Sequence, residues 1–121
     1  MPKKILIADD DAHIRELISL TLEDDGYEIQ EAQDGIEAVA KAKQLRPDLI
    51  IMDVMMPGKV GYVACAEIKQ NPATKNAYVI LLTARGTPVA KQTSQDCGAD
   101  LFLTKPFEPK DLRERIKKIL G

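Results

Sequence analysis

In the stretch Asp48-Leu49-Ile50-Ile51-Met52-Asp53, an unbroken apolar run stands between two aspartates. A short apolar run with polar ends is typical of a strand that is covered on both faces of a parallel sheet. The Pro57-Gly58 pair then breaks the chain before the next helix begins. We therefore predict that 49–53 form the central strand of an α/β sheet.

Strand-like and helix-like segments alternate on both sides of this run. Ile5-Leu6-Ile7-Ala8 is a second apolar run, whereas Ile14, Ile18 and Leu22 have the spacing of an amphipathic helix. Such alternation is the pattern of βα units that close a parallel sheet. We predict one doubly wound (βα)5 domain over 1–121. Its strands are expected at 5–8, 27–32, 49–53, 78–82 and 101–104, and its helices at 14–22, after Asp34, and at 62–69, 88–96 and 111–120.

The same periodicity predicts which helical residues face the core. The expected inner stripes are Ile14, Leu17, Ile18, Thr21 and Leu22 in the first helix, and Ile36, Val39 and Ala40 in the second. The helix at 88–96 offers only the small or polar side chains Ala90, Thr93, Ser94 and Cys97. Because these side chains bury little apolar area, we expect this helix to be the least firmly docked and to carry any conformational change.

The composition excludes several classes of protein. The 121 residues carry 17 Lys and Arg against 19 Asp and Glu, a net charge of −2, so there is no general basic field to bind nucleic acid. No apolar run approaches the roughly 20 residues of a membrane helix, and the run at 5–8 is too short for a signal-peptide core. We expect a cytoplasmic protein in which Cys65 and Cys97 are small buried side chains rather than redox or metal ligands.

Polar and charged residues gather where the predicted strands end. In an open parallel α/β sheet, the ligand site lies beyond the carboxyl ends of the strands. The residues that end or follow the strands are Asp9, Asp10, Asp11, Asp53, Thr83 and Lys105. Carboxylates within a few ångströms raise one another's pKa, and a hard divalent cation held by oxygens removes this conflict. The pattern therefore predicts a Mg2+ site.

Several of these residues also have a simpler interpretation. Asp11 alone would serve as a helix cap, and Lys105 would be one of many solvated lysines. Asp53 favours the interpretation of these residues as a binding site, because a carboxylate that ends so apolar a strand is costly to bury without a partner. His13 is interpreted as an exposed residue at the start of the first helix.

From Lys3 to Leu120 the chain resembles the receiver domains of two-component response regulators. Five separated segments carry the resemblance, namely ILIADDD (5–11), DLIIMDVMMPG (48–58), LLTA (81–84), GAD (98–100) and TKPF (104–107). Each segment is a weak signal alone, but together and in this order they are specific. The resemblance implies a flavodoxin-like three-layer sandwich with strand order 2-1-3-4-5.

By the same resemblance, Asp53 accepts a phosphoryl group from a histidine kinase, a phosphotransfer protein or a small phosphodonor. Asp10, Asp53 and the backbone carbonyl of Met55 would hold Mg2+ directly, while Asp9 would act mainly through a bound water. Such a domain is a phosphoacceptor switch rather than an enzyme with a separate substrate.

The resemblance also implies how the switch works. Thr83 and Lys105 would hold the phosphoryl oxygens, and Phe102 would turn inward on activation. A downstream protein or an output domain would then bind the face formed by 88–96, 101–104 and 111–120. A weak dimer through that face is a further expectation.

Two segments depart from the commonest family pattern. Lys59-Val60-Gly61 stands where many members have Met-Asp-Gly, and Leu101 stands where many transcriptional members have an aspartate. The second departure weakens the case for a charged dimer contact. The charges that remain for such a contact are Asp100, Arg113 and Arg115.

Two other functions compete with this interpretation. A metal-dependent aspartyl-phosphate phosphatase also uses a D-x-D motif, which Asp9 and Asp11 provide, but such enzymes generally need more chain for a substrate cap. A flavodoxin-like nucleotide binder would need a glycine-rich phosphate loop after 5–8, and this chain has aspartates there.

Overall fold

Five parallel strands form one sheet within residues 2–121, the part of the chain that the computed structural model describes. The strands are β1 (Lys4–Ala8), β2 (Glu28–Ala32), β3 (Leu49–Asp53), β4 (Tyr78–Thr83) and β5 (Leu101–Thr104). The helices are α1 (Ala12–Leu22), α2 (Gly35–Leu45), α3 (Gly61–Gln70), α4 (Pro88–Asp96) and α5 (Pro109–Leu120), and a short 3-10 helix, η1 (Glu23–Asp25), follows α1. The strand order β2-β1-β3-β4-β5 confirms the predicted doubly wound, flavodoxin-like fold.

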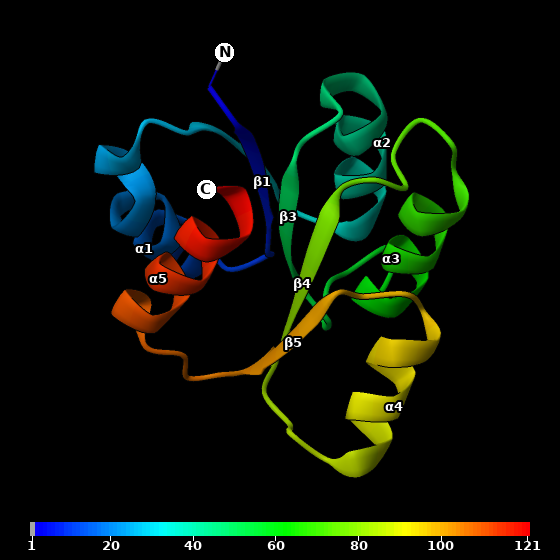
Figure 1. The fold of residues 1–121 in the computed structure, drawn as a ribbon. Coiled ribbons are helices and arrows are strands. Elements are labelled where there is room, and N and C mark those ends of the chain that lie inside the picture. Colours follow the sequence, from blue (N-terminus) through cyan, green and yellow to red (C-terminus); the bar gives the residue numbers. More distant parts are fainter. Residues whose placement is uncertain (1) are drawn as a thin grey trace.

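Strand β3 is the centre of the sheet, as its apolar run predicts. All of its residues are buried, because β1 and β4 pair with its two edges and helices cover both faces. Ile51 packs in the cluster that includes Ile18 of α1 and Ile116 of α5, whereas Ile50 packs with residues of α2 and α3. Figure 1 shows the resulting three layers, with α1 and α5 on one side of the sheet and α2, α3 and α4 on the other.

The predicted stripe of α2 is wrong at two of its three positions. Val39 is buried, but Ile36 is 59% exposed and Ala40 is also exposed. The helix instead buries the small residues Ala38 and Ala42, which let it lie close to the sheet. Its first turn is set by Gly35, where a Cβ atom would lie 1.8 Å from the carbonyl oxygen of Lys59.

The stripe of α1 is narrower than the sequence suggests. Ile18 and Leu22 are buried and Ile14 packs against them, but Leu17 is 41% exposed. Residues spaced by four lie along the centre of the buried face, and a residue three positions from Ile14 lies on its flank. Leu17 is therefore a surface residue.

Helix α4 buries fewer of its residues than any of the other four α-helices. Ser94 is its only buried residue, and Val89 near its first turn is 76% exposed. Cys65 in α3 is buried as expected, whereas Cys97, just after α4, is half-buried and packs against the same core cluster. Cys97 lies beyond the last turn of a thinly covered helix, so its burial is incomplete.

Within residues 2–121, no helix is both long enough and apolar enough to span a membrane.

Candidate functional site

Three aspartates meet at the carboxyl edge of the sheet. Asp9 follows β1 and Asp53 ends β3, so the pairing of these neighbouring strands brings the two carboxylates together. One oxygen from each of Asp9, Asp10 and Asp53 lies within 4.8 Å of the others. Asp9 and Asp53 are buried, and Asp10 is exposed. Such a cluster of oxygens matches the ligands that hard divalent cations prefer.

Lys105 joins this cluster from the far side of β4. Its backbone amide donates to the carbonyl of Thr83, which fixes where the side chain starts. The Nζ atom then lies 3.0 Å from Oδ2 of Asp9 and 3.3 Å from Oδ2 of Asp53. One ammonium group therefore bridges the two buried carboxylates.

The charges in this cluster shift the protonation of two groups. Burial and the negative charge of Asp9 raise the pKa of Asp53, and Lys105 offsets only part of that rise. Burial alone would lower the pKa of Lys105, but its hydrogen bond to Asp9 and the charges of both aspartates raise it overall. The site is short of positive charge, which a bound cation would supply.

Asp11 lies beside the cluster but has another role. Its side chain accepts a hydrogen bond of 2.9 Å from the amide of His13 and so caps α1. Its own amide donates to Oδ1 of Asp9, also at 2.9 Å. The simpler interpretation of the aspartate trio thus holds for Asp11, while Asp9 and Asp10 belong to the acidic cluster. His13 is exposed.

Thr83 and Met55 line the rim of the site. The amide of Met55 donates to Oδ1 of Asp53 at 3.3 Å, and Met55 is 68% exposed. Thr83 is buried, and its hydroxyl accepts a hydrogen bond of 3.2 Å from the amide of Arg85. Both residues line a groove of about 600 Å³ that runs from the site to the start of α4.

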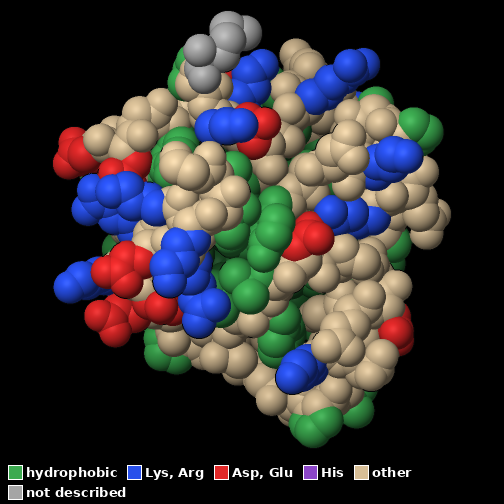
Figure 2. Space-filling model, in the orientation of Figure 1, with side chains coloured by type: hydrophobic (Ala, Val, Ile, Leu, Met, Phe, Trp, Pro, Cys, Tyr) green, Lys and Arg blue, Asp and Glu red, His purple; other side chains and the backbone are tan. Residues whose placement is uncertain are grey.

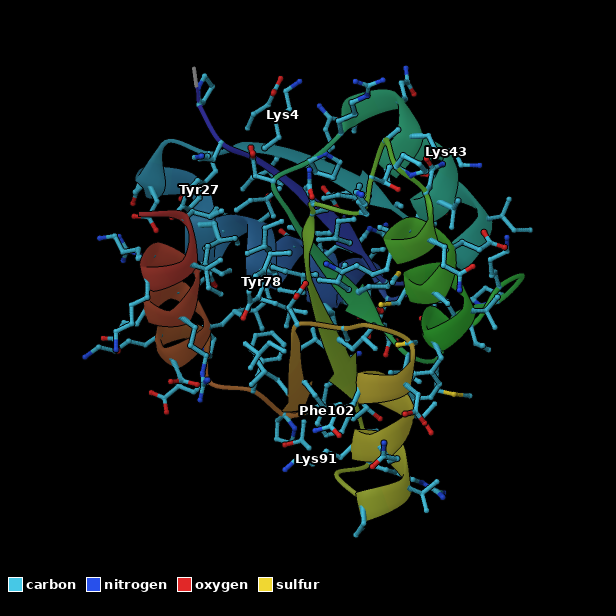
Figure 3. The ribbon with its side chains drawn as sticks, turned by 45° about the vertical axis from the view of Figure 1, so that its right-hand side comes forward. Lys4, Tyr27, Lys43, Tyr78, Lys91 and Phe102 are labelled. Carbon is cyan, nitrogen blue, oxygen red and sulfur yellow. The ribbon has the colours of Figure 1, made fainter. Side chains whose placement is uncertain are left out.

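Phe102 is apart from the acidic cluster. It is half-buried in β5 and lines a groove of about 200 Å³ with Lys91 and Ser94 of α4. Figure 3 shows Phe102 beside α4, close to Lys91. Its surroundings in this structure are those of the α4 helix rather than of Asp53.

Two residues that shape the site were not expected from the sequence. A Cβ atom on Gly61 would lie 2.4 Å from the carbonyl oxygen of Asp53, so only glycine allows α3 to start against the end of β3. Arg15 of α1 donates to the backbone carbonyl of Asp9. For Gly61, its position shortly after the Pro57-Gly58 break was a signal in the sequence. For Arg15 there was none, because a hydrogen bond to a backbone carbonyl leaves no pattern in the sequence.

Comparison with known proteins agrees with this geometry. The sequence model of one protein family, the response regulator receiver domain, matches residues 5–117. RpaA, a DNA-binding dual master transcriptional regulator of Synechocystis, is 42% identical over 99% of this chain and 49% of its own length. PhoB, the phosphate regulon transcriptional regulatory protein of Escherichia coli, is 38% identical over 99% of this chain and 52% of its own.

A solved structure gives the same result in three dimensions. The chemotaxis response regulator CheY4 of Vibrio cholerae is 37% identical and superimposes with a TM-score of 0.91, covering 98% of this chain and 99% of its own. The chain spans about half the length of the curated relatives RpaA and PhoB. With its fold, its acidic cluster and its matched family model, the chain belongs to the receiver domains of response regulators.

Proposed function

We propose that Asp53 accepts a phosphoryl group and that the domain acts as a switch in two-component signal transduction. The observation that carries this proposal is the bridging of Asp9 and Asp53 by Lys105, at 3.0 and 3.3 Å. This arrangement holds a carboxylate nucleophile, a pair of further carboxylates and a cation in one place. Phosphoryl transfer needs little more than an aligned nucleophile and positive charge around the equatorial oxygens.

The residues present fit a Mg2+ ion. Asp9, Asp10 and Asp53 offer oxygens within 4.8 Å of one another, and the backbone carbonyl of Met55 is the further ligand that we propose. Asp9 would act mainly through water, because its two oxygens already bond Lys105 and the amide of Asp11. Bound Mg2+ would neutralise charge on the oxygens of the phosphoryl group.

The chain's own groups account for the rest of the transfer. An oxygen of ionised Asp53 forms a bond to phosphorus as the bond from phosphorus to the donor breaks. The leaving group is the imidazole of the donor histidine, or acetate when acetyl phosphate is the donor. Lys105 holds a phosphoryl oxygen in place of the Asp53 oxygen that it contacts here. Thr83, which ends β4 next to β3, would turn its hydroxyl toward another phosphoryl oxygen.

We further propose that this change reaches a partner through α4, β5 and α5. Movement of Thr83 would free space into which Phe102 turns, and α4 would dock anew as the binding face. The phosphoryl donor would be a histidine kinase or a phosphotransfer protein in the cytoplasm, and the partner a downstream protein or an output domain. Residues 1–121 are proposed to form this single receiver domain, which has no separate substrate to turn over.

The charges on this face favour a different protein as partner over a second copy of the chain. Arg113 pairs with Asp25 at 2.7 Å, Asp100 with Lys69 at 2.6 Å and Arg115 with Asp111 at 2.9 Å. A dimer built on these charges would have to break intramolecular ion pairs. Figure 2 shows acidic and basic side chains side by side over α5, next to a strip of hydrophobic side chains.

The phosphatase interpretation fits the site less well. A D-x-D enzyme needs its second aspartate as an acid or base beside the first, but Asp11 caps α1. Incubation with acetyl phosphate and Mg2+ should add one phosphoryl mass to the wild-type chain and none to Asp53→Asn. Equal labelling of the variant, or turnover of p-nitrophenyl phosphate, would contradict the proposal.

A further inference from the structure

Arg15 connects three elements next to the acidic cluster. Its Nη1 atom donates to the backbone carbonyl of Asp9 at 2.6 Å, and its Nε atom lies 2.9 Å from the Glu31 carboxylate of β2. Only 14% of the Arg15 side chain is exposed. A charge-assisted bond to a carbonyl is stronger than a neutral one, so this contact restrains the end of β1.

The peptide unit that Arg15 holds is the one that directs Asp10. The carbonyl of Asp9 and the amide of Asp10 lie in one rigid plane, so fixing the oxygen fixes where the Asp10 backbone points. The other side of this turn is fixed by the amide of Asp11, which donates to the side-chain Oδ1 of Asp9. Asp10 itself is exposed, and within residues 2–121 its side chain makes no hydrogen bond or ion pair.

We propose that Arg15 is a positioning residue for Mg2+ binding, which holds the Asp9–Asp10 peptide so that the Asp10 carboxylate faces Asp53. This inference rests on the proposed function, because it takes Asp10 as a metal ligand. Glu31 assists by orienting the guanidinium group. Since β2 is the edge strand and Glu31 is partly exposed, the bond to Asp9 is the primary contact and the pair with Glu31 the secondary one.

A purely electrostatic role would have the opposite effect on Mg2+. A guanidinium group near a cation site repels the cation, so loss of the charge alone would tighten Mg2+ binding. Loss of the positioning contact leaves Asp10 free to rotate away and weakens binding. The direction of the change therefore distinguishes the two roles.

The test is a calorimetric titration of the unphosphorylated chain with Mg2+ alone, in wild type, Arg15→Ala, Arg15→Lys and Glu31→Gln. We expect Arg15→Ala to bind Mg2+ about tenfold more weakly, as is usual when a group that orients a metal ligand is removed. Arg15→Lys should restore part of the affinity, because an ammonium group can still donate to the carbonyl. Glu31→Gln should cost less than Arg15→Ala.

The matched control is Arg113→Ala, which removes an arginine–aspartate pair at η1 and α5, away from the cluster. It should lower the melting temperature and leave Mg2+ affinity unchanged. Unchanged or tighter Mg2+ binding by Arg15→Ala would overturn the inference, and if that variant does not fold, full affinity in both Arg15→Lys and Glu31→Gln would overturn it. A wild-type chain that binds no Mg2+ would overturn both the proposed metal site and the role of Arg15.

Discussion

The ammonium group of Lys105 lies 3.3 Å from the carboxylate of Asp53, on the far side of the intervening strand β4. The same group is closer to Asp9, at 3.0 Å, so the Asp53 contact is the weaker of its two. In this state Lys105 occupies the place where a phosphoryl oxygen would need a cation. The resting site therefore holds its own positive charge in position for the proposed transfer.

Asp53→Asn should make the folded chain more stable near neutral pH. Burial and the charge of Asp9 raise the pKa of Asp53, so the folded state binds this proton more tightly than the unfolded state does. Stability is therefore lost as pH rises through the folded pKa, and the uncharged asparagine avoids this loss. Urea unfolding should show a higher free energy of unfolding for Asp53→Asn than for the wild type at about pH 7. This difference should vanish near the ordinary aspartate pKa of about 3.9. The exposed Asp24→Asn should show no such gain, and an equal effect in both variants would count against the buried charge.

Asp10→Ala and Asp11→Ala should affect different properties of the chain. Asp10→Ala removes a proposed ligand and should weaken Mg2+ binding, with little effect on unfolding because its side chain is exposed. Asp11→Ala removes the cap of α1 and should cost about 1 kcal/mol of stability while Mg2+ affinity is kept. A Mg2+ titration and a urea unfolding curve of each variant measure both effects. Equal loss of affinity in the two variants would show that the roles are assigned wrongly.

Gly61→Ala should displace the phosphoacceptor. The added Cβ would lie 2.4 Å from the carbonyl of Asp53, so either α3 or the end of β3 must shift. We expect a loss of about 2 kcal/mol or more in stability, together with slower labelling by acetyl phosphate. Gly26→Ala is the control, because its φ of +80° makes alanine unfavourable while nothing lies within 4 Å of the added atom. Gly26→Ala should lose stability only, and normal labelling of Gly61→Ala would argue against this contact.

Helix α4 should be the most mobile helix and the one that changes most on activation. Its single buried residue, Ser94, anchors it far less than Leu112 and Ile116 anchor α5. Amide hydrogen exchange should therefore be fastest among the helices at residues 86–97. Beryllofluoride with Mg2+, which stands in for the phosphoryl group, should alter exchange there more than elsewhere. A larger change in α1 than in α4 would contradict the proposed route through Thr83.

The residues that could be predicted from the sequence are those whose position follows from topology. The run at 49–53 is apolar because β3 is covered on both faces, and parallel pairing alone then brings the ends of β1 and β3 together. Lys105 reaches the same edge for the same reason. These relations depend on backbone direction, which alternating strand and helix patterns specify well.

Other features depend on local geometry that a pattern does not encode. Leu17 and Ile36 have helical spacing, but each lies outside the buried face of its helix and is exposed. Asp11 follows two pocket aspartates, and the residues alone allowed both a cap and a place in the acidic cluster. The hydrogen bond from the amide of His13 decides for the cap. Arg15 acts on a backbone carbonyl, so its identity as a positioning residue depends on a contact that no motif describes.

The position of the phosphoryl group on the chain distinguishes Asp53 from the other aspartates at this edge of the sheet. After incubation with acetyl phosphate and Mg2+, borohydride reduces an aspartyl phosphate to homoserine, which peptide mass spectrometry can assign to one position. We expect homoserine at position 53 and unmodified aspartate at positions 9, 10 and 11. Homoserine at one of those three positions, with Asp53 intact, would contradict Asp53 as the phosphoacceptor.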